Sequence, residues 1–213
     1  MNRTLVVIAK APRPGHSKTR LCPPCTPAQA AALAEAALRD TLAAVAASVA
    51  DRRLLVLDGQ PGPWLPDGFD VVAQRGDGLD QRLAAAFAEA GDGAFLVGMD
   101  TPQICASRLE AGLAALRHAD AALGRAPDGG YWGIGLRRPD RRVFEGVPMS
   151  EAGTGDAQEA RLASLGLRVA ALPRLRDVDT IDDAVAVARD APRTRFAATL
   201  AALGFGLEDR AAA

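Results

Sequence analysis

The loop that follows the first apolar run is rich in basic residues. It reads AKAPRPGHSKTRL over residues 9–21, directly after TLVVI. Gly15 lets the backbone approach a ligand closely. The Lys18 ammonium offers a point charge to phosphate oxygens, and the planar Arg20 guanidinium can donate two hydrogen bonds to them. The spacing of a Walker loop is absent, which disfavours an ordinary ATPase or kinase. The loop is a candidate phosphate-binding element, and a solvated basic surface loop is the alternative.

Carboxylates at two later places suit a hard cation. Asp100 follows the apolar run AFLVGM, and Asp177 and Asp179 lie in the string DVDTIDD. Mg²⁺ usually binds one or two carboxylates together with substrate phosphates. An Asp in such places also caps helices and turns, which is the plainer interpretation. These three residues are candidate ligands for Mg²⁺ or Mn²⁺.

The stretch APDGGYWGIGL combines a carboxylate, two glycines and two aromatic residues. Asp128 precedes Gly129 and Gly130, and Tyr131 and Trp132 follow them. A tight glycine turn that presents a carboxylate and aromatic faces suits recognition of a sugar or another small acceptor. The alternative is a hairpin turn with aromatic residues in the core.

Two of the three cysteines, Cys22 and Cys25, form a Cys-x-x-Cys pair. A redox pair needs its first cysteine at a helix N-terminus, whereas both residues precede the helix start expected at Thr26. A zinc site needs two further ligands, and the sequence has no second cysteine pair and only two histidines. We therefore interpret the thiols as incidental and expect no structural disulfide.

Short β-branched runs alternate with Ala- and Leu-rich segments, which predicts an α/β fold with a mainly parallel sheet. The expected strands cover residues 4–9, 53–57, 69–74, 94–99, 119–126 and 167–172, and 131–137 is a further apolar run. The expected helices cover residues 27–50, 79–90, 107–118, 156–165, 181–189 and 194–203. Ligands of such sheets bind at the carboxyl ends of the strands, where most of the candidate residues fall.

The composition fits one globular domain over residues 1–213, with a core of about 4–190 and a C-terminal helix of about 193–204. A net charge of −1 gives no electrostatic footprint for nucleic acid. No apolar run approaches the length of a membrane span, and the first is too short for a signal peptide. We expect a cytoplasmic protein with small-molecule ligands; the sequence leaves a homodimer open.

Five motifs occur in the order and spacing of a known family: AKAPRPGHSKTRL, QRGDGLDQRL, GMDTP, DGGYWGIGL and DVDTIDD. The chain thereby resembles the radical-SAM/selenodomain-associated transferases over residues 4–188. It is more distantly similar to the phospholactate and molybdenum-cofactor guanylyltransferases, which share the basic first loop and the strand-end Asp. The resemblance implies a three-layer α/β/α fold of the nucleotide-diphospho-sugar transferase, or glycosyltransferase-A, type.

The resemblance also implies a role for each matching position. Nucleotide binding is implied for Ala9, Lys10, Ala11, Gly15, Lys18, Arg20, Gln74 and Gly76. Acceptor binding is implied for Asp128, Gly129, Gly130, Tyr131, Trp132 and Ser150. The metal would bind Asp100, assisted by Asp177 or Asp179. The implied catalytic residues are Lys18, Arg20, Asp100 and Asp128.

One segment departs from the family pattern. The family has Trp-Ser-Thr where this chain reads MSE at residues 149–151, and apolar residues where Thr154 and Gly155 stand. The segment belongs to the acceptor side, so the identity of the acceptor cannot be carried over from the family.

These observations predict a metal-dependent transferase that uses a nucleotide-activated donor. Glycosyl transfer from a nucleotide-sugar to a small acceptor is the leading hypothesis. The first alternative is nucleotidyl transfer, which joins a nucleoside triphosphate to a small phosphorylated acceptor and releases pyrophosphate. The second is a nucleotide-sensing protein without catalysis that has kept the fold.

Overall fold

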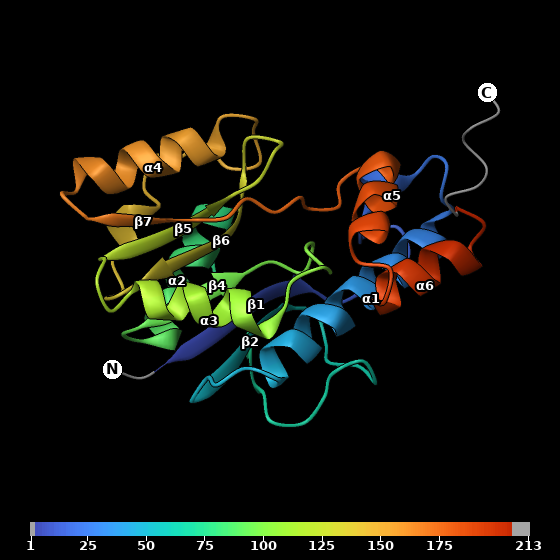
Figure 1. The fold of residues 1–213 in the computed structure, drawn as a ribbon, viewed down its shortest axis with the longest axis horizontal. Helices are drawn as coiled ribbons and strands as arrows, with labels where there is room; N and C mark the ends of the chain where they lie inside the picture. The colour runs from blue at the N-terminus through green and yellow to red at the C-terminus, as the bar shows by residue number, and fades with distance from the viewer. Residues whose placement is uncertain (1–2, 206–213) are drawn as a thin grey trace.

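The computed structural model describes residues 3–205, in which a seven-stranded sheet has the order β3-β2-β1-β4-β6-β5-β7 (Figure 1). The strands are β1 (Thr4–Lys10), β2 (Arg52–Asp58), β3 (Asp70–Ala73), β4 (Ala94–Val97), β5 (Ala121–Arg125), β6 (Tyr131–Leu136) and β7 (Val169–Leu172). The helices are α1 (Pro27–Ala46), α2 (Leu79–Ala90), α3 (Ala106–Ala115), α4 (Thr154–Ser164), α5 (Ile181–Asp190) and α6 (Arg195–Ala202), with short 3₁₀ helices η1 (Thr19–Leu21) and η2 (Arg141–Val143).

The mainly parallel sheet is confirmed, with β6 as the strand that runs in the opposite direction. Strand β1 pairs in parallel with β2 and β4, and β5 pairs in parallel with β7. Strand β6 is antiparallel to both β4 and β5, because a short turn after β5 reverses the chain. As a result, β6 begins at the edge of the sheet where β1 and β4 end.

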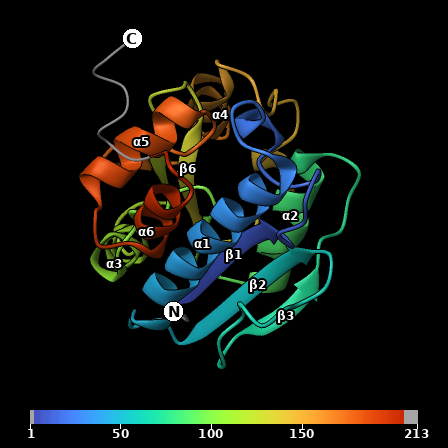
Figure 2. The same cartoon turned by 90° about the vertical axis from the view of Figure 1, so that its right-hand side faces the viewer.

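Helices cover both faces of the sheet, so the expected three-layer α/β/α fold is confirmed. Alternate residues of β1 point to opposite faces: Leu5 and Val7 join one hydrophobic cluster with α1 and α3, and Val6 joins another with α2 and α4. Figure 2 shows α1 lying along β1, with α2 on the other side of the sheet. The two clusters form the core that holds the sheet in place.

A third hydrophobic cluster joins α1 to the C-terminal helices α5 and α6. Its largest fully buried side chain is Phe196 of α6. The Asp40 carboxylate of α1 accepts hydrogen bonds from the amides of Arg195 and Phe196, which fixes the start of α6. This packing also fixes α5, whose first residue follows the DVDT string directly.

Two helices, α1 and α3, end three or more residues before their expected ends. Helix α1 starts as expected, with a capping box between Thr26 and Gln29, but it ends at Ala46 because the Ser48 hydroxyl then donates to the Val45 carbonyl. Helix α3 ends at Ala115, three residues early, where the chain changes to tighter turns. Neither difference moves a candidate site residue. None of the helices within residues 3–205 is long and apolar enough to cross a bilayer.

Candidate functional site

A cleft of about 910 Å³ lies where β1 and β4 end and β6 begins. Its wall includes Ala9 and Lys10 at the end of β1, Asp100 after β4, and Asp128 and Tyr131 from the turn that leads into β6. Segments far apart in the sequence therefore meet at this edge, as the strand-end rule for open α/β sheets requires. The volume is in the range of small-molecule sites.

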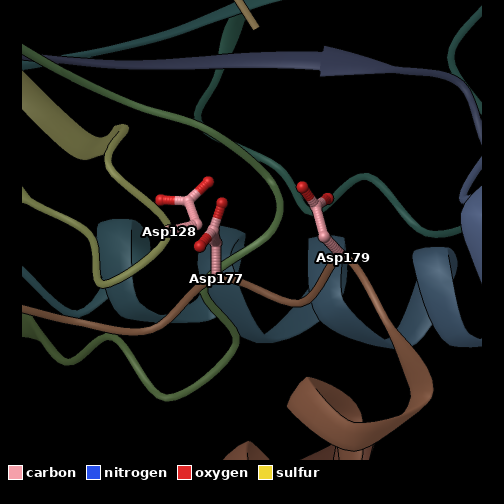
Figure 3. Close-up of side chains that lie close together, drawn as sticks. All are labelled: Asp128, Asp177 and Asp179. Carbon is pink, nitrogen blue, oxygen red and sulfur yellow. The ribbon is translucent and has the colours of Figure 1, made fainter. Parts of the chain in front are cut away.

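Three carboxylates form a cluster in the cleft. Asp128, Asp177 and Asp179 each offer an oxygen, and these atoms all lie within 4.8 Å of one another. Figure 3 shows the side chains of Asp128 and Asp177 next to each other. Asp179 lies further along the extended segment that carries Asp177. The intervening Val178 is buried in the C-terminal cluster, which leaves both neighbouring carboxylates on the cleft side.

The electrostatics of this cluster suit a divalent cation. Burial, followed by the negative charges of Asp128 and Asp179, raises the pKa of Asp177 from 3.8 to about 6. Asp179 pairs with Lys18 and Arg20, whereas no ion pair among residues 3–205 involves Asp128 or Asp177. Carboxylate oxygens are also the ligands that Mg²⁺ and Mn²⁺ prefer. The residues present therefore fit a hard divalent ion.

We expect stabilisation by Mn²⁺ to depend on pH through Asp177. Its folded pKa of about 6 exceeds the ordinary 3.8, so the folded state binds more protons between these values. The metal-free protein should therefore lose stability as the pH rises from about 4 to about 6. A metal ion needs the ionised carboxylate, so its stabilising effect should grow over the same range.

Thermal unfolding with and without Mn²⁺, at about pH 5 and about pH 7.5, measures this dependence. The shift in Tm should be clearly larger at the higher pH. An equal shift at both pH values would contradict the assignment of Asp177 as a ligand.

Lys18 is held inside the site by carboxylates. Its side chain is 9% exposed, and its ammonium lies 2.8 Å from Asp100 Oδ1 and 3.4 Å from Asp179 Oδ1. It also donates to the carbonyl of Val178. Burial opposes the charge, but Asp100 and Asp179 outweigh it and raise the pKa of Lys18. The ammonium thus connects the loop after β1, the end of β4 and the segment before α5.

The structure groups the acidic residues differently from the expected metal set. Asp100, the expected principal ligand, pairs with Lys18, whereas Asp128 joins Asp177 and Asp179. The reason is the reversal of the chain between β5 and β6, which brings Asp128 to the edge where the DVDT string passes. The grouping favours Asp128, Asp177 and Asp179 as ligands, with Asp100 next to them.

Basic side chains from the loop after β1 and from α2 also line the cleft. Arg20 is 66% exposed and pairs with Asp179 at 2.9 Å. Lys10 is exposed at the end of β1. Arg82 of α2, which the sequence analysis did not single out, bonds the Gly76 carbonyl and the Gln74 side chain. We call this part of the lining the basic wall; its charged members and one histidine are Lys10, His16, Lys18, Arg20 and Arg82.

Several residues expected at the nucleotide support the loops around the cleft. Gln74 lines the cleft, but its side-chain amide donates to the carbonyls of Ala9 and Val56. A Cβ on Gly76, where φ is +119°, would lie 2.6 Å from the Cβ of Gln81. The remaining expected nucleotide residues outside the cleft lining are Ala11 and Gly15. Their effect on a ligand is therefore through the shape of the loops.

The turn between β5 and β6 packs tightly on the loop before α4. Gly129 has a φ of +94°, and a Cβ there would lie 1.7 Å from the Ala152 carbonyl oxygen. The Gly155 amide donates to the Gly129 carbonyl at 2.8 Å, and the Gly130 amide donates to Asp128 Oδ1. Gly129 itself does not line the cleft, contrary to its expected contact with the acceptor. Its role is to fix Asp128.

The two aromatic residues of β6 are mainly structural. Trp132 is 4% exposed, donates to the Pro173 carbonyl and meets the ring of Phe95 edge to face. Tyr131 donates to Gln158, and burial raises the pKa of its hydroxyl. Both reach the cleft lining, but the alternative of a hairpin with core aromatics describes Trp132 better.

The loop before α4 completes the side of the cleft formed by residues 128–154, which we call the acceptor wall because the family resemblance implies acceptor binding there. It carries Met149, Ser150 and Glu151, all of which line the cleft. Ser150 has a φ of +63°, a left-handed conformation that is rare outside glycine and costs about 1 kcal/mol or more. Ser150 and its neighbours therefore lie in a strained turn that faces the cleft. Glu151 belongs to the MSE segment that departs from the family pattern, and it was not itself a candidate site residue.

The Cys22–Cys25 pair lacks the features of a reactive thiol site. All three cysteines of the chain are free thiols, and Cys25 is buried against the C-terminal helices. Burial, and then the proximity of Cys22, raises the pKa of Cys25, whereas a reactive cysteine needs a lowered one.

We therefore expect a Cys22→Ala, Cys25→Ala double variant to keep its response to Mn²⁺ and nucleotide. The loss of the buried thiol should cost about 1 kcal/mol of stability. Thermal unfolding with and without ligand measures both quantities. Loss of the ligand response in a folded variant would restore a role for the thiols.

The sequence matches one family model across more than half of its length. Residues 29–151 match the family described as "Uncharacterized protein conserved in bacteria (DUF2064)". The chain belongs to this family. The matched DUF2064 range includes the Asp128 turn and Glu151, whereas the basic loop and the Asp177 string lie outside it. The curated proteins contain no match to this chain.

Solved structures share the fold. A candidate nucleotide-diphospho-sugar transferase from Desulfovibrio desulfuricans G20 is 28% identical, with a TM-score of 0.84 and 96% of each chain covered. Rv0371c from Mycobacterium tuberculosis H37Rv is 24% identical, with a TM-score of 0.54 and coverage of 86% of this chain and 96% of that one. CMP:2-keto-3-deoxy-manno-octonic acid synthetase, solved with CTP, is 12% identical, with a TM-score of 0.54 and coverage of 84% and 94%. The DUF2064 chain therefore has the nucleotide-diphospho-sugar transferase fold.

Proposed function

We propose that this protein is a metal-dependent transferase that takes a nucleotide-sugar as donor and a small molecule as acceptor. The observation that carries the proposal is the arrangement of the cleft. A cluster of three carboxylates lies in the same cleft as a wall of basic side chains, at the carboxyl ends of β1 and β4. This combination suits a diphosphate held between a divalent ion and basic side chains.

The charged residues of the cleft have different roles in the proposed reaction. Asp128, Asp177 and Asp179 would hold the ion, which supplies positive charge to phosphate oxygens when bound. Arg20, exposed at the mouth of the cleft, can turn from Asp179 to a phosphate oxygen. Lys18 stays at the base of the cleft and keeps Asp100 and Asp179 in position. Together they stabilise negative charge on a departing nucleoside diphosphate.

The related structures support the donor class. The Desulfovibrio protein with 28% identity is described as a candidate nucleotide-diphospho-sugar transferase. Rv0371c, similar in fold, has been solved with manganese. Both descriptions agree with the ligand types that the cleft favours on its own chemistry.

Nucleotidyl transfer is the second candidate. The basic wall carries Lys10, Lys18, Arg20 and Arg82, enough charge for the more negative nucleoside triphosphate. The fold also occurs in the synthetase solved with CTP. In this reaction the acceptor attacks the α-phosphate and pyrophosphate leaves.

A panel of nucleotide-sugars and nucleoside triphosphates with Mn²⁺ or Mg²⁺ tests the proposal. A donor at 100 times its Kd should stabilise the protein by about 2.7 kcal/mol. Release of nucleoside diphosphate supports glycosyl transfer, and release of pyrophosphate supports nucleotidyl transfer. Stabilisation without turnover would favour a nucleotide sensor. Neither stabilisation nor turnover across the panel would overturn the proposal.

A further inference from the structure

The two walls of the cleft carry opposite charge. The basic wall comes from the loop after β1 and from α2, whereas residues 128–154 of the acceptor wall contribute no Lys, Arg or His to the lining. That part of the lining consists of Asp128, Gly130, Tyr131, Trp132, Gly133, Met149, Ser150, Glu151, Ala152 and Thr154. Its charged side chains are both carboxylates.

The carboxylate of Glu151 adds a negative charge to the acceptor wall and has no structural partner among the described residues. Glu151 is exposed in the cleft, and among the described residues its side chain makes no hydrogen bond or ion pair. Its backbone amide, in contrast, donates to the Thr154 hydroxyl, which in turn donates to the Pro148 carbonyl. The backbone of Glu151 is therefore fixed, and the residue lines the cleft with an exposed side chain that is unpaired within residues 3–205.

Arg125, the basic residue at the end of β5, pairs with carboxylates of α4. Its guanidinium lies 2.6 Å from Asp156 and 3.0 Å from Glu159, both on α4. It is 18% exposed and does not line the cleft. A phosphate or carboxylate group brought to the loop before α4 would thus meet Glu151 without a basic partner from residues 128–154.

We propose that the acceptor is a hydroxyl-bearing molecule that is uncharged or carries an amino group, and that phosphorylated and carboxylated acceptors are excluded. This inference rests on the proposed function, since it takes the basic wall to hold the donor. Like charges that face each other across an interface suppress the wrong partner, while hydroxyl and ammonium groups can donate to Glu151 and Ser150, which are not assigned to the ion. Met149 and Tyr131 supply apolar surface beside them.

The transfer step balances with such an acceptor. The acceptor hydroxyl oxygen forms a bond to the anomeric carbon of the donor sugar, and the bond from that carbon to the diphosphate oxygen breaks. The nucleoside diphosphate leaves with the electron pair, and the hydroxyl proton passes to solvent in the open cleft.

The test uses matched pairs of acceptors that differ only in a phosphate. The full-length protein is incubated with Mn²⁺, the nucleotide-sugars that stabilise it, and glycerol, glucose and glucosamine, each together with its phosphate ester. Products are identified by mass spectrometry. We expect products on the unphosphorylated members, preferred by about tenfold or more.

A charge-reversal variant makes the test specific to this wall. Glu151→Lys should shift the preference towards phosphate esters by about tenfold. Asp92→Lys, the same charge reversal at the opposite end of β4, is the matched control and should leave the preference unchanged.

The outcomes separate the two proposals. Wild-type preference for phosphate esters overturns the acceptor class and leaves the transferase intact. Donor hydrolysis without a product on either member of any pair also counts against the acceptor class. Failure to bind or consume any nucleotide-sugar overturns the proposed function, and the acceptor class with it.

Discussion

Replacing Asp177 by asparagine is expected to abolish stabilisation by Mn²⁺ and, at the same time, to make the metal-free protein more stable. The Asp177 carboxylate is partly buried and lies beside Asp128 and Asp179, which is why its pKa is raised to about 6. Removing its charge at neutral pH relieves that repulsion. Solvent screens part of the effect, so we expect a gain of about 1–2 kcal/mol.

The same substitution removes a carboxylate that would bind the metal, so we expect it to weaken metal binding and activity. Mn²⁺ affinity should fall by about 100-fold or more, and turnover of the nucleotide donor should fall with it. Thermal unfolding without metal and calorimetric titration with Mn²⁺ measure the two effects. Opposite signs for stability and function are typical of a residue selected for its site.

Asp190→Asn is the matched control for this variant. It makes the same change at the far end of α5, outside the cleft. Both its stability without metal and its Mn²⁺ affinity should equal those of the wild type. An Asp177→Asn protein that keeps its full response to Mn²⁺ would show that the carboxylate cluster does not bind the ion.

Replacing Gly129 by alanine is expected to damage both stability and the metal site. The new Cβ would lie 1.7 Å from the Ala152 carbonyl oxygen, and the φ of +94° is unfavourable for any side chain. The turn and the loop before α4 must then separate. We expect a loss of about 2–4 kcal/mol and weaker Mn²⁺ binding, because Asp128 moves with the turn.

Gly166→Ala separates conformational strain from the clash. Gly166 also has a left-handed φ, +72°, but a Cβ there would meet no atom within 4 Å. This control should cost about 1 kcal/mol and leave Mn²⁺ affinity unchanged. Equal stability losses in the two variants, with equal Mn²⁺ affinity, would remove the proposed role of Gly129.

Local patterns in the sequence predicted most of the fold. The capping box at Thr26 and the β-branched runs each depend on neighbouring residues, so the start of α1 and the strands fell close to their expected places. The direction of β6 was harder to predict, because YWGIGL has the same apolar character in either orientation. Strand direction depends on the turn geometry and on pairing with β4.

The sequence predicted where in the fold the candidate site lies. It did not predict which of its charged side chains pair with one another. The strand-end rule placed Lys18, Asp100 and Asp128 at one edge, and Asp177 was added as a possible further metal ligand. Which carboxylate meets Lys18 depends on side-chain positions fixed by contacts between distant segments, such as the bond from the Val178 amide to the Asp100 carbonyl. Glu151 had no motif of its own, and the strained turn at Ser150 that precedes it is visible only in three dimensions.

The reversed direction of β6 has a consequence for how such a protein can diversify. The basic wall comes from the first half of the chain. The acceptor wall is formed by the hairpin turn before β6 and by the loop of residues 144–153. Surface loops accept insertions and replacements without disturbing the strand register beneath them. Under the proposed function, changes in these loops would exchange one acceptor for another while the half of the chain that carries the basic wall, the sheet and the C-terminal helices are inherited intact.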